Sequence, residues 1–393
     1  MSTSIKIAII SDLHCTSKKD TATITRLHGE LLPKPISRNP IESIKERIIF
    51  EKLIADYLLC LGDVADKSDP SGLSNGIGYL NEIQLQLNAK ELFLVAGNHD
   101  IDVANADPFH MLKSLDLPAI DPDSKSSYWN DHFCIIEKDD IVLFLINTCF
   151  HIRTTDDLAS SPPFNNDIIL DDINSRLNNY QNINKFKLVL CHHHPVQQSD
   201  FNDKYTSNDL IDGADRLLNI VKDNGFHLVL HGHKHIARIK YDDDLPIFCS
   251  GSFSSLENIN PFDNKNTFHI IELKLDNHLC KGKITTWVYN YNSGWNKCED
   301  PNFSFPAYTG FGCSYRNVKQ ICDEIIDKFN NWYKNEEPNK ILPFNEVVNF
   351  FPDIEHITPR QQDELMRYFR DTYGLEVCPN IKNGATHIIK LKL

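Results

Sequence analysis

The sequence predicts a layered α/β domain followed by a smaller α+β module. Up to about residue 300, short apolar runs alternate with helical patterns, which is typical of sheets covered by helices. Most of these runs are continuously apolar, as expected for strands that are buried on both faces. A segment rich in Gly, Pro, Asn and Ser follows at 295–313, and we interpret it as a linker. We therefore expect one domain at 1–300 and a second module at 311–393.

The expected strands of the first domain are short and coincide with the apolar runs. They lie at 5–11, 56–62, 91–97, 141–147, 187–191, 226–232, 245–252, 266–275 and 284–291. Helical patterns lie between several of them, for example at 41–55, 75–89 and 210–224. The strands from 245 to 291 follow one another closely, which favours antiparallel pairing. A mixed sheet is therefore expected.

The second module has the pattern of three helices followed by a β-hairpin. The helices are expected at 315–334, 344–351 and 359–373, and the strands at 375–378 and 385–393. Thr358 and Pro359 form a helix start, Gly374 a helix stop, and Asn383-Gly384 a turn. This order resembles a winged-helix module, in which 359–373 would be the recognition helix. Residues 311–393 carry 11 Lys and Arg against 12 Asp and Glu, so there is no basic footprint, and either a nucleic acid or a protein partner remains open.

The composition indicates a soluble protein of the cytoplasm. The chain has 393 residues and a formal net charge of −14, which disfavours non-specific binding to nucleic acid. No apolar run approaches the roughly 20 residues that cross a bilayer, and the N-terminal segment lacks the layout of a signal peptide. The 11 cysteines include no C-x-x-C pair, and several lie in apolar runs, which suits a reducing compartment. We expect no contact with a membrane; the oligomeric state stays open.

Polar motifs follow five of the predicted strands. Each one alone is explained as well by a tight turn or a polar loop. Together they place oxygen and nitrogen donors at strand ends, which face one crevice in an open α/β sheet. Carboxylate, amide and imidazole form a donor set for divalent transition metals without sulfur ligands. The motifs are D-x-H with Asp12 and His14, G-D-x-x-D with Asp63 and Asp66, G-N-H-D with Asn98 and His99, the His192–His194 run before Pro195, and G-H-x-H with His233 and His235.

The order of these motifs resembles the calcineurin-like metallophosphoesterases, over about residues 5–275. The resemblance implies a four-layer αββα sandwich of two mixed sheets with a two-metal centre at one edge. It also implies a role for each position. The first metal would be held by Asp12, His14, Asp63 and His235, and the second by the bridging Asp63 with Asn98, His193 and His233. His192 is the alternative to His193. His99 would assist the leaving group, and Asp66 would pair with His99.

The expected activity is hydrolysis of a phosphodiester, such as a nucleotide, by attack of a metal-bridging hydroxide. In the family's phosphoprotein phosphatases, Arg and Glu occupy the positions of Lys67 and Asp100, so the sequence is closer to the bacterial phosphodiesterases. The cofactors would be two divalent ions, Mn, Fe or Zn, with Mn favoured. One alternative is a nuclease to which the C-terminal module presents DNA or RNA. A scaffold without catalysis is disfavoured because every ligand position is filled.

Two further segments are candidates for the rim of the site, that is, for loops that border the substrate beside the metals. The insertion from Cys15 to about Ile41 is longer than a simple connection and starts beside the motif D-x-H. It carries the basic residues Lys18, Lys19, Arg26, His28 and Arg38. The second segment leaves the strand at 141–147 and carries His151 and Arg153. For both segments, an ordinary solvated loop is the alternative.

Overall fold

The computed structural model describes residues 3–18, 25–29, 35–118, 120–197, 210–256, 265–276, 279–298, 305–313, 317–334 and 342–390. The chain divides into two compact units. The larger unit comprises Ile5–Ile270 and Val288–Asn296. The C-terminal unit comprises Met1–Ser4, Ile271–Trp287 and Lys297–Leu393. Among the described residues, no helix combines the length and the apolar composition that crossing a bilayer requires.

One mixed sheet has seven strands in the order β12-β11-β10-β1-β2-β3, with β13 paired to β11. β1 to β3 are parallel and end level with one another, because Ile10 pairs with Cys60 and Cys60 with Leu94. The loops that follow these three strands therefore begin at the same edge. The strands are β1 (Thr3–Ile10), β2 (Tyr57–Cys60), β3 (Glu91–Leu94), β10 (Thr267–Asp276), β11 (Leu279–Asn290), β12 (Gly294–Lys297) and β13 (Tyr308–Phe311).

The second mixed sheet has six strands in the order β4-β5-β6-β7-β9-β8. The four central strands are parallel, and β4 and β8 add antiparallel edges. β6 and β7 also end level with each other, because Leu190 pairs with Leu230. The strands are β4 (Phe133–Glu137), β5 (Ile141–Ile146), β6 (Phe186–Leu190), β7 (Leu228–His231), β8 (Ala237–Asp242) and β9 (Leu245–Ser250).

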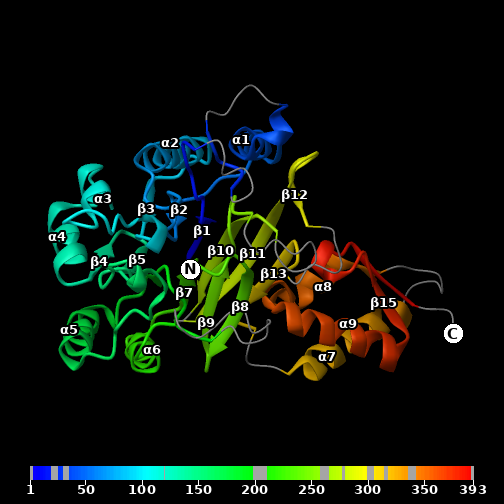
Figure 1. Ribbon diagram of the computed structural model, residues 1–393. Coiled ribbons are helices and arrows are strands. Elements are labelled where there is room, and N and C mark those ends of the chain that lie inside the picture. Colours follow the sequence, from blue (N-terminus) through cyan, green and yellow to red (C-terminus); the bar gives the residue numbers. More distant parts are fainter. Residues whose placement is uncertain are drawn as a thin grey trace. The chain divides into compact units, whose positions relative to one another are not determined.

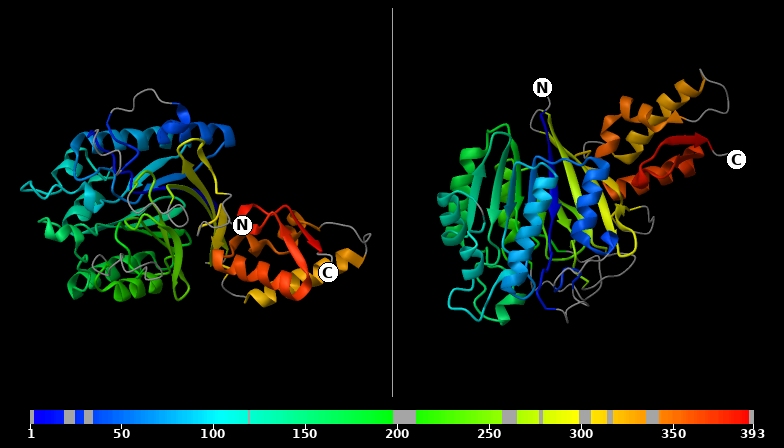
Figure 2. Two further views of the ribbon diagram at one scale, coloured as in Figure 1. Left: turned by 45° about the vertical axis from the view of Figure 1, so that its right-hand side comes forward. Right: turned by 90° about the horizontal axis from the view of Figure 1, so that it is seen from above.

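Helices cover the outer faces of the two sheets. In the larger unit, the sheets lie between the α1–α2 pair and the α5–α6 pair, which gives four layers (Figures 1 and 2). The apolar faces of α5 and α6 pack on the six-stranded sheet through Leu170, Ile173, Leu217 and Val221. The helices are α1 (Pro40–Glu51), α2 (Pro70–Gln86), α3 (His110–Ser114), α4 (Pro122–Asn130), α5 (Asp167–Leu177) and α6 (Ala214–Asp223). The predicted αββα architecture of two mixed sheets is confirmed.

Several helices begin where the sequence places a capping side chain. The side chains of Asn39, Asp69, Asp121 and Asn166 accept hydrogen bonds from backbone N–H groups in the first turns of α1, α2, α4 and α5. A proline occupies the first position of the first three of these helices, where its missing N–H costs no hydrogen bond. α4 and α5 are not among the helices named from the sequence.

The strand predictions omit β4 and differ from the structure again after residue 230. We expected antiparallel neighbours from 245 to 291, but β9 belongs to the six-stranded sheet and pairs with β7 and β8. The polar edge strand β8 was not predicted, because its residues carry no continuous apolar run. The expected linker at 295–313 contributes to β12 and contains β13. Pairing in three dimensions, and not local composition, makes these segments strands.

The C-terminal unit has its own core of helices and a three-stranded antiparallel sheet of order β14-β16-β15. Thr358 and Gln361 form a capping box at the start of α9, and Gly374 ends that helix with a positive φ of 62°. The order of elements matches the predicted winged-helix pattern with one added short strand. The elements are α7 (Val318–Lys334), β14 (Leu342–Pro343), α8 (Phe344–Phe350), α9 (Pro359–Tyr373), β15 (Leu375–Cys378) and β16 (His387–Lys390).

A buried histidine of β10 is expected to make folding sensitive to acid. The ring of His269 is fully buried, and its Nε2 donates to the carbonyl oxygen of Ser250. Burial lowers the pKa of His269 to about 4. Between about pH 6.5 and 4 the unfolded chain binds the proton and the folded chain does not, so stability falls as the pH is lowered, by at most about 3 kcal/mol. In His269→Gln, the unfolding temperature should fall less between pH 7 and pH 4.5 than in the wild type. Equal losses in His269→Gln and in the more exposed control His110→Gln would contradict this assignment.

Candidate metal centre

The loops after five strands meet at one edge of the larger unit. The loop after β1 lies against the loop after β2, since the backbone N–H groups of Asp12 and His14 donate to the carbonyl oxygens of Gly62 and Asp63. The loop after β7 joins them, because the N–H of His233 donates to both carboxylate oxygens of Asp12, at 3.1 and 3.2 Å. Backbone hydrogen bonds between loops thus bring together side chains that are more than 200 residues apart.

Four of these side chains form a first group of donor atoms: Asp12, His14, Asp63 and His235. The Nε2 atoms of His14 and His235 face each other at 3.0 Å. Nε2 of His235 lies 3.3 Å from Oδ1 of Asp12, and Nε2 of His14 lies 3.6 Å from Oδ2 of Asp63. All four ligands were predicted to hold the first metal, and the structure brings them together.

A second group of donors shares Asp63 with the first. Nε2 of His192 lies 3.4 Å from Oδ2 of Asp63, the oxygen that also faces His14. The same Nε2 lies 3.2 Å from Nδ1 of His233 and 3.0 Å from Oδ1 of Asn98. One carboxylate oxygen therefore lies between two sets of donors, which is the arrangement of a bridging ligand.

The spacing of the donors fits divalent cations. With metal–ligand bonds near 2.1 Å, adjacent donors of an octahedral or tetrahedral ion are about 3.0 to 3.4 Å apart. The donor pairs that contact each other directly are 3.0 to 3.6 Å apart, and within each metal-binding cluster the donor atoms of the carboxylates and imidazoles lie within 4.8 Å of one another. A contact between two imidazole Nε2 atoms can hold at most one proton, whereas a cation at the centre satisfies both lone pairs. The residues present therefore fit a pair of metal ions.

Neighbouring groups fix the orientation of the ligands of the second group. Nδ1 of His192 lies 2.7 Å from the carbonyl oxygen of Leu61 and carries a proton, so Nε2 is the ring nitrogen that can bind a cation once its own proton is released. The amide nitrogen of Asn98 donates to the carbonyl oxygen of Leu158 at 3.3 Å, which turns its Oδ1 towards His192. These contacts preorganise the donors for a cation.

The buried carboxylates carry negative charge that nearby positive charge must compensate. Burial alone would raise the pKa of Asp63, but the surrounding histidines, His192 above all, hold it well below its ordinary value. Conversely, burial opposes a charge on His192, yet Asp63 raises its pKa to about 9. The imidazolium here compensates the carboxylate. A bound cation would supply the same compensation more effectively, which again fits a metal centre.

Five of the ligands have a backbone conformation that is unfavourable for residues other than glycine. Their φ angles are positive, and each such residue costs of order 1 kcal/mol. Strain of this kind persists only where the surrounding structure enforces it, and it clusters at functional sites. The five are Asp12 (53°), His14 (47°), Asp63 (53°), His233 (69°) and His235 (55°).

Two glycines of the motifs are required by the close packing of the ligands. A Cβ atom at Gly97 would lie 2.1 Å from Oδ1 of Asp63. At Gly232 it would lie 2.1 Å from Oγ of Ser11 and 2.7 Å from Oδ2 of Asp12. The glycines of G-N-H-D and G-H-x-H therefore leave room for the carboxylates.

His99 and Asp66 form a pair beside the first group. Nδ1 of His99 lies 3.3 Å from Oδ1 of Asp66, and the side chain of His99 is 26% exposed. The N–H of His99 also donates to Oδ1 of Asp63 at 2.8 Å, which ties this residue to the shared ligand. Burial opposes ionisation of Asp66, but its contacts with His14 and His99 lower its pKa. The predicted pairing of these two residues is present, with Asp66 held as the anion.

His192, and not His193, belongs to the second group of donors. Nδ1 of His193 lies 2.9 Å from Oγ1 of Thr148, and its Nε2 has no hydrogen-bond partner in the described part of the chain. We predicted His193 because it lies two residues before Pro195. In the structure, β6 ends at Leu190, and after Cys191 the next side chain, that of His192, is the one that faces the donors. The structure thus places His192, the alternative that the sequence left open, in this group of donors in place of His193.

Asp100 and Lys67, the two departures from the phosphoprotein phosphatase pattern, are both outside the donor groups. The carboxylate of Asp100 is buried and accepts hydrogen bonds from the N–H groups of Ala65 and Gly97, so it connects the loops after β2 and β3. Burial and the nearby Asp63 raise the pKa of Asp100 to about 7. Lys67 is exposed and has a positive φ of 47°.

The predicted rim residues near β5 contact neighbouring loop residues of the described chain. Nε2 of His151 lies 3.0 Å from Oγ of Ser160, and the guanidinium of Arg153 lies 5.2 Å from the ring centroid of Phe109. This segment contributes instead through the carbonyl of Leu158, which holds Asn98. No sequence signal marked that backbone contact. Of the basic residues in the insertion, Lys19 lies outside the described residues.

Asp69 is a second contributor that the sequence argument missed. Its Oδ1 caps the first turn of α2, while its Oδ2 accepts hydrogen bonds from Oγ1 of Thr16 and from the N–H and Oγ of Ser17. Asp69 thereby fixes the segment that follows His14. The sequence Asp69-Pro70 before a helical pattern was the available signal, since it is typical of a helix N-cap.

Comparisons with known proteins give similar solved structures and one matching family model. Among solved structures, a purple acid phosphatase from yellow lupin (Lupinus luteus) seeds matches with 11% identity and a TM-score of 0.49, over 75% of this chain and 52% of that chain. GAP50, described as the anchor in the inner membrane complex of Plasmodium, matches with 15% identity and a TM-score of 0.43, over 76% and 91% of the two chains. A phosphopantetheinyl hydrolase from Mycobacterium tuberculosis matches with 13% identity and a TM-score of 0.35, over 63% and 89%.

This chain thus spans about half of the lupin protein. No curated protein matches the sequence significantly. The family model described as calcineurin-like phosphoesterase matches residues 5–237, which is more than half of the chain and includes all five motifs. The chain therefore belongs to the calcineurin-like phosphoesterase family.

Proposed function

We propose that the protein is a metal-dependent phosphodiesterase acting on a nucleotide or another small phosphodiester. The observation that carries this proposal is the position of Oδ2 of Asp63 between the two donor groups. The first ion would be held by Asp12, His14, Asp63 and His235, and the second by Asp63, Asn98, His192 and His233. Two such ions, when bound, lower the pKa of a water molecule and neutralise charge on the phosphoryl oxygens.

The chain's own residues then orient and protonate the substrate. Asp66 holds Nδ1 of His99, so that the opposite ring nitrogen, Nε2, is the atom that we assign to the leaving oxygen. A proton delivered there is typically worth about 10²–10⁴-fold in rate. The anionic Asp66 favours the protonated ring that this step needs. Asp66 acts as the positioning residue of this pair.

The preference for a diester rests on what the site lacks relative to the phosphoprotein phosphatases. A monoester carries two charges and benefits from a bidentate arginine clamp. Here Lys67 replaces that arginine and is exposed. A diester carries one charge and needs less compensation. Among metals we favour Mn, because half of the proposed donors are carboxylate or amide oxygens, which suit Mn better than Zn.

The test is turnover of bis-p-nitrophenyl phosphate and p-nitrophenyl phosphate by metal-stripped protein after Mn²⁺, Zn²⁺ or Fe²⁺ is restored. We expect a higher kcat/KM for the diester, with Mn²⁺ the most effective ion. A higher kcat/KM for the monoester would overturn the diesterase proposal while leaving the metal centre intact. Failure of every ion to restore turnover of either ester would overturn the catalytic role itself.

The alternative in which the C-terminal module presents nucleic acid gains no support from its charges. On α9, Arg360 pairs with Glu364, and Arg370 pairs with Glu376 of β15. Arginines that are neutralised within the module offer little to a phosphate backbone. A nuclease activity would need another surface.

A further inference from the structure

Two arginines of the insertion between β1 and α1 stack on tyrosines at the end of β11. The guanidinium of Arg26 lies 5.0 Å from the ring centroid of Tyr289, and that of Arg38 lies 5.0 Å from the ring centroid of Tyr291. Tyr289 is fixed in turn, because its hydroxyl donates to the carbonyl oxygen of Ser37. Stacking of this kind orients the plane of a guanidinium and leaves its N–H edge available.

Arg26 has donors that the described part of the chain does not use. Its Nε donates to Oδ1 of Asn266 at 2.7 Å, and no hydrogen bond of its Nη atoms to the described residues is present. Burial lowers the pKa of Arg26, and no carboxylate among the described residues pairs with it or with Arg38. The chain has 54 acidic residues and a net charge of −14, so arginines without a carboxylate partner point to an external anion.

The pair of arginines lies at the edge of the sheet that carries the metal centre. Thr25, the neighbour of Arg26, bonds through Oγ1 to the carbonyl oxygen of Leu13, which lies between Asp12 and His14. The N–H of Arg26 donates to the carbonyl oxygen of Ser254. Tyr289 belongs to β11, which is two strands away from β1 in the sheet. Strands are about 4.8 Å apart, so this position is on the order of 10 Å from the loop of Asp12.

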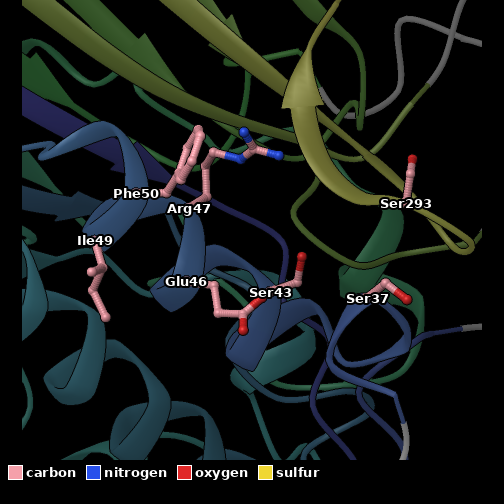
Figure 3. A pocket seen from close by; sticks show the side chains of 7 residues that line it. All are labelled: Ser37, Ser43, Glu46, Arg47, Ile49, Phe50 and Ser293. Carbon is pink, nitrogen blue, oxygen red and sulfur yellow. The ribbon is translucent and has the colours of Figure 1, made fainter.

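A hollow lies beside α1 and includes Ser37, the neighbour of Arg38 in the sequence. It measures about 570 Å³ and is lined by Ser37, by side chains of α1 between Ser43 and Phe50, and by Ser293 in the turn after β11. Figure 3 shows the hydroxyl groups of Ser37, Ser43 and Ser293 and the guanidinium of Arg47 around it. Arg47 is paired with Glu51, whereas Tyr291, on which Arg38 stacks, is 46% exposed and lies two residues before Ser293 of the hollow. An exposed aromatic ring next to a cation offers a stacking surface for a base.

We propose that Arg26 and Arg38 bind a second phosphate group of the substrate, on the order of 10 Å along the sheet edge from the phosphodiester that is cleaved. The substrate class is then a nucleotide or short oligonucleotide with more than one phosphate. This inference rests on the proposed phosphodiesterase function and names the substrate of the same site. In this proposal the nucleotide binds at the sheet edge of the larger unit and not on the C-terminal module.

The test compares dinucleotides that differ only in a terminal phosphate. We measure kcat/KM of the metal-loaded wild type for TpT, pTpT and TpTp. The expected result is that at least one phosphorylated dinucleotide exceeds TpT about tenfold, mainly through KM, and that this ratio falls towards one in Arg26→Met. Arg26→Lys should keep part of the ratio, because it keeps the charge but not the planar fork. The control Arg216→Met removes an arginine that is paired with Asp167 and should leave the ratio unchanged.

Two further measurements separate the possible failures. Arg38→Met changes an exposed side chain and should lower the same ratio severalfold, which covers the case in which Arg26→Met does not fold. Binding of labelled oligothymidylate in EDTA should weaken about tenfold in Arg26→Met and hardly in Arg216→Met. A wild type that cleaves bis-p-nitrophenyl phosphate but shows no preference for a terminal phosphate would overturn this inference alone. A wild type without any diesterase activity would overturn the proposed function, and unchanged binding in EDTA would then overturn the second phosphate site as well.

Discussion

Asp63→Asn is expected to reduce kcat by at least about 10³-fold and to lower the metal content from two ions per chain to one or none. Oδ1 of Asp63 accepts a hydrogen bond from the N–H of His99, so an asparagine oxygen would keep that position. The amide nitrogen would then replace Oδ2, the atom that lies between the two donor groups. An amide NH₂ donates hydrogen bonds and cannot bind a cation. A loss of 10³-fold corresponds to about 4 kcal/mol of transition-state stabilisation.

The same variant has a readout that does not depend on activity. Asp63 is fully buried and its charge is compensated by the surrounding histidines, so Asp63→Asn should lower the unfolding temperature of the metal-free protein. The readout is therefore the further change in unfolding temperature that metal adds to each protein. Addition of Mn²⁺ should raise the unfolding temperature of the wild type, because the ions bind only the folded chain. That rise should be largely lost in Asp63→Asn and retained in the surface control Asp116→Asn. An equal rise in Asp63→Asn would show that this residue does not bridge two ions.

His192→Ala and His193→Ala are expected to differ clearly in metal content and in kcat, although each removes a fully buried imidazole and the two positions are adjacent. His192→Ala should lose one ion per chain and at least about 10²-fold in kcat, because Nε2 of His192 faces Asp63, Asn98 and His233. His193→Ala removes a ring that is bonded to Thr148 and leaves the donor group complete. It should keep two ions and lose less than about tenfold in activity, with some loss of thermal stability from the cavity.

Metal content by elemental analysis and the unfolding temperature with and without Mn²⁺ check this pair together. The two substitutions are matched in volume and burial, so the packing cost is similar and the difference reports ligation. The reverse result, in which His193→Ala loses an ion and His192→Ala does not, would reinstate the ligand that the sequence pattern selected.

The sequence was sufficient for most of the architecture because its local signals agree with the tertiary structure. Continuous apolar runs marked the central strands, and caps such as Thr358 and Gly374 marked the ends of α9. The segments that were missed are those whose structure depends on partners. β8 is an edge strand with mostly polar, half-exposed residues, and it is a strand because β9 pairs with it. β13 lies in a segment with the composition of a linker and becomes a strand by pairing with β11.

In the candidate site, too, the sequence predicted some features, and others depend on the tertiary structure. Motif chemistry identified every loop that carries a donor, because only strand ends can present so many polar groups at one edge. It could not count residues within the run of three histidines, since the choice depends on where β6 ends and how each ring turns. It also gave no sign of the carbonyl of Leu158 or the positive φ angles of five ligands.

What the sequence determined by itself is the chemical type of the donors. They are carboxylates, an amide and imidazoles in five motifs, and the motifs follow strands whose apolar composition predicts that they are buried. What only the tertiary structure decided is their geometry. The level ends of β1, β2 and β3, and the backbone hydrogen bonds between loops, place Oδ2 of Asp63 between two groups of donors. The physical reason is the distance over which each signal acts. Hydrophobic pattern and capping act between residues that are close in the sequence. The metal centre instead brings donor atoms to within 3.0 to 3.6 Å of each other, although some of their segments are more than 200 residues apart in the sequence.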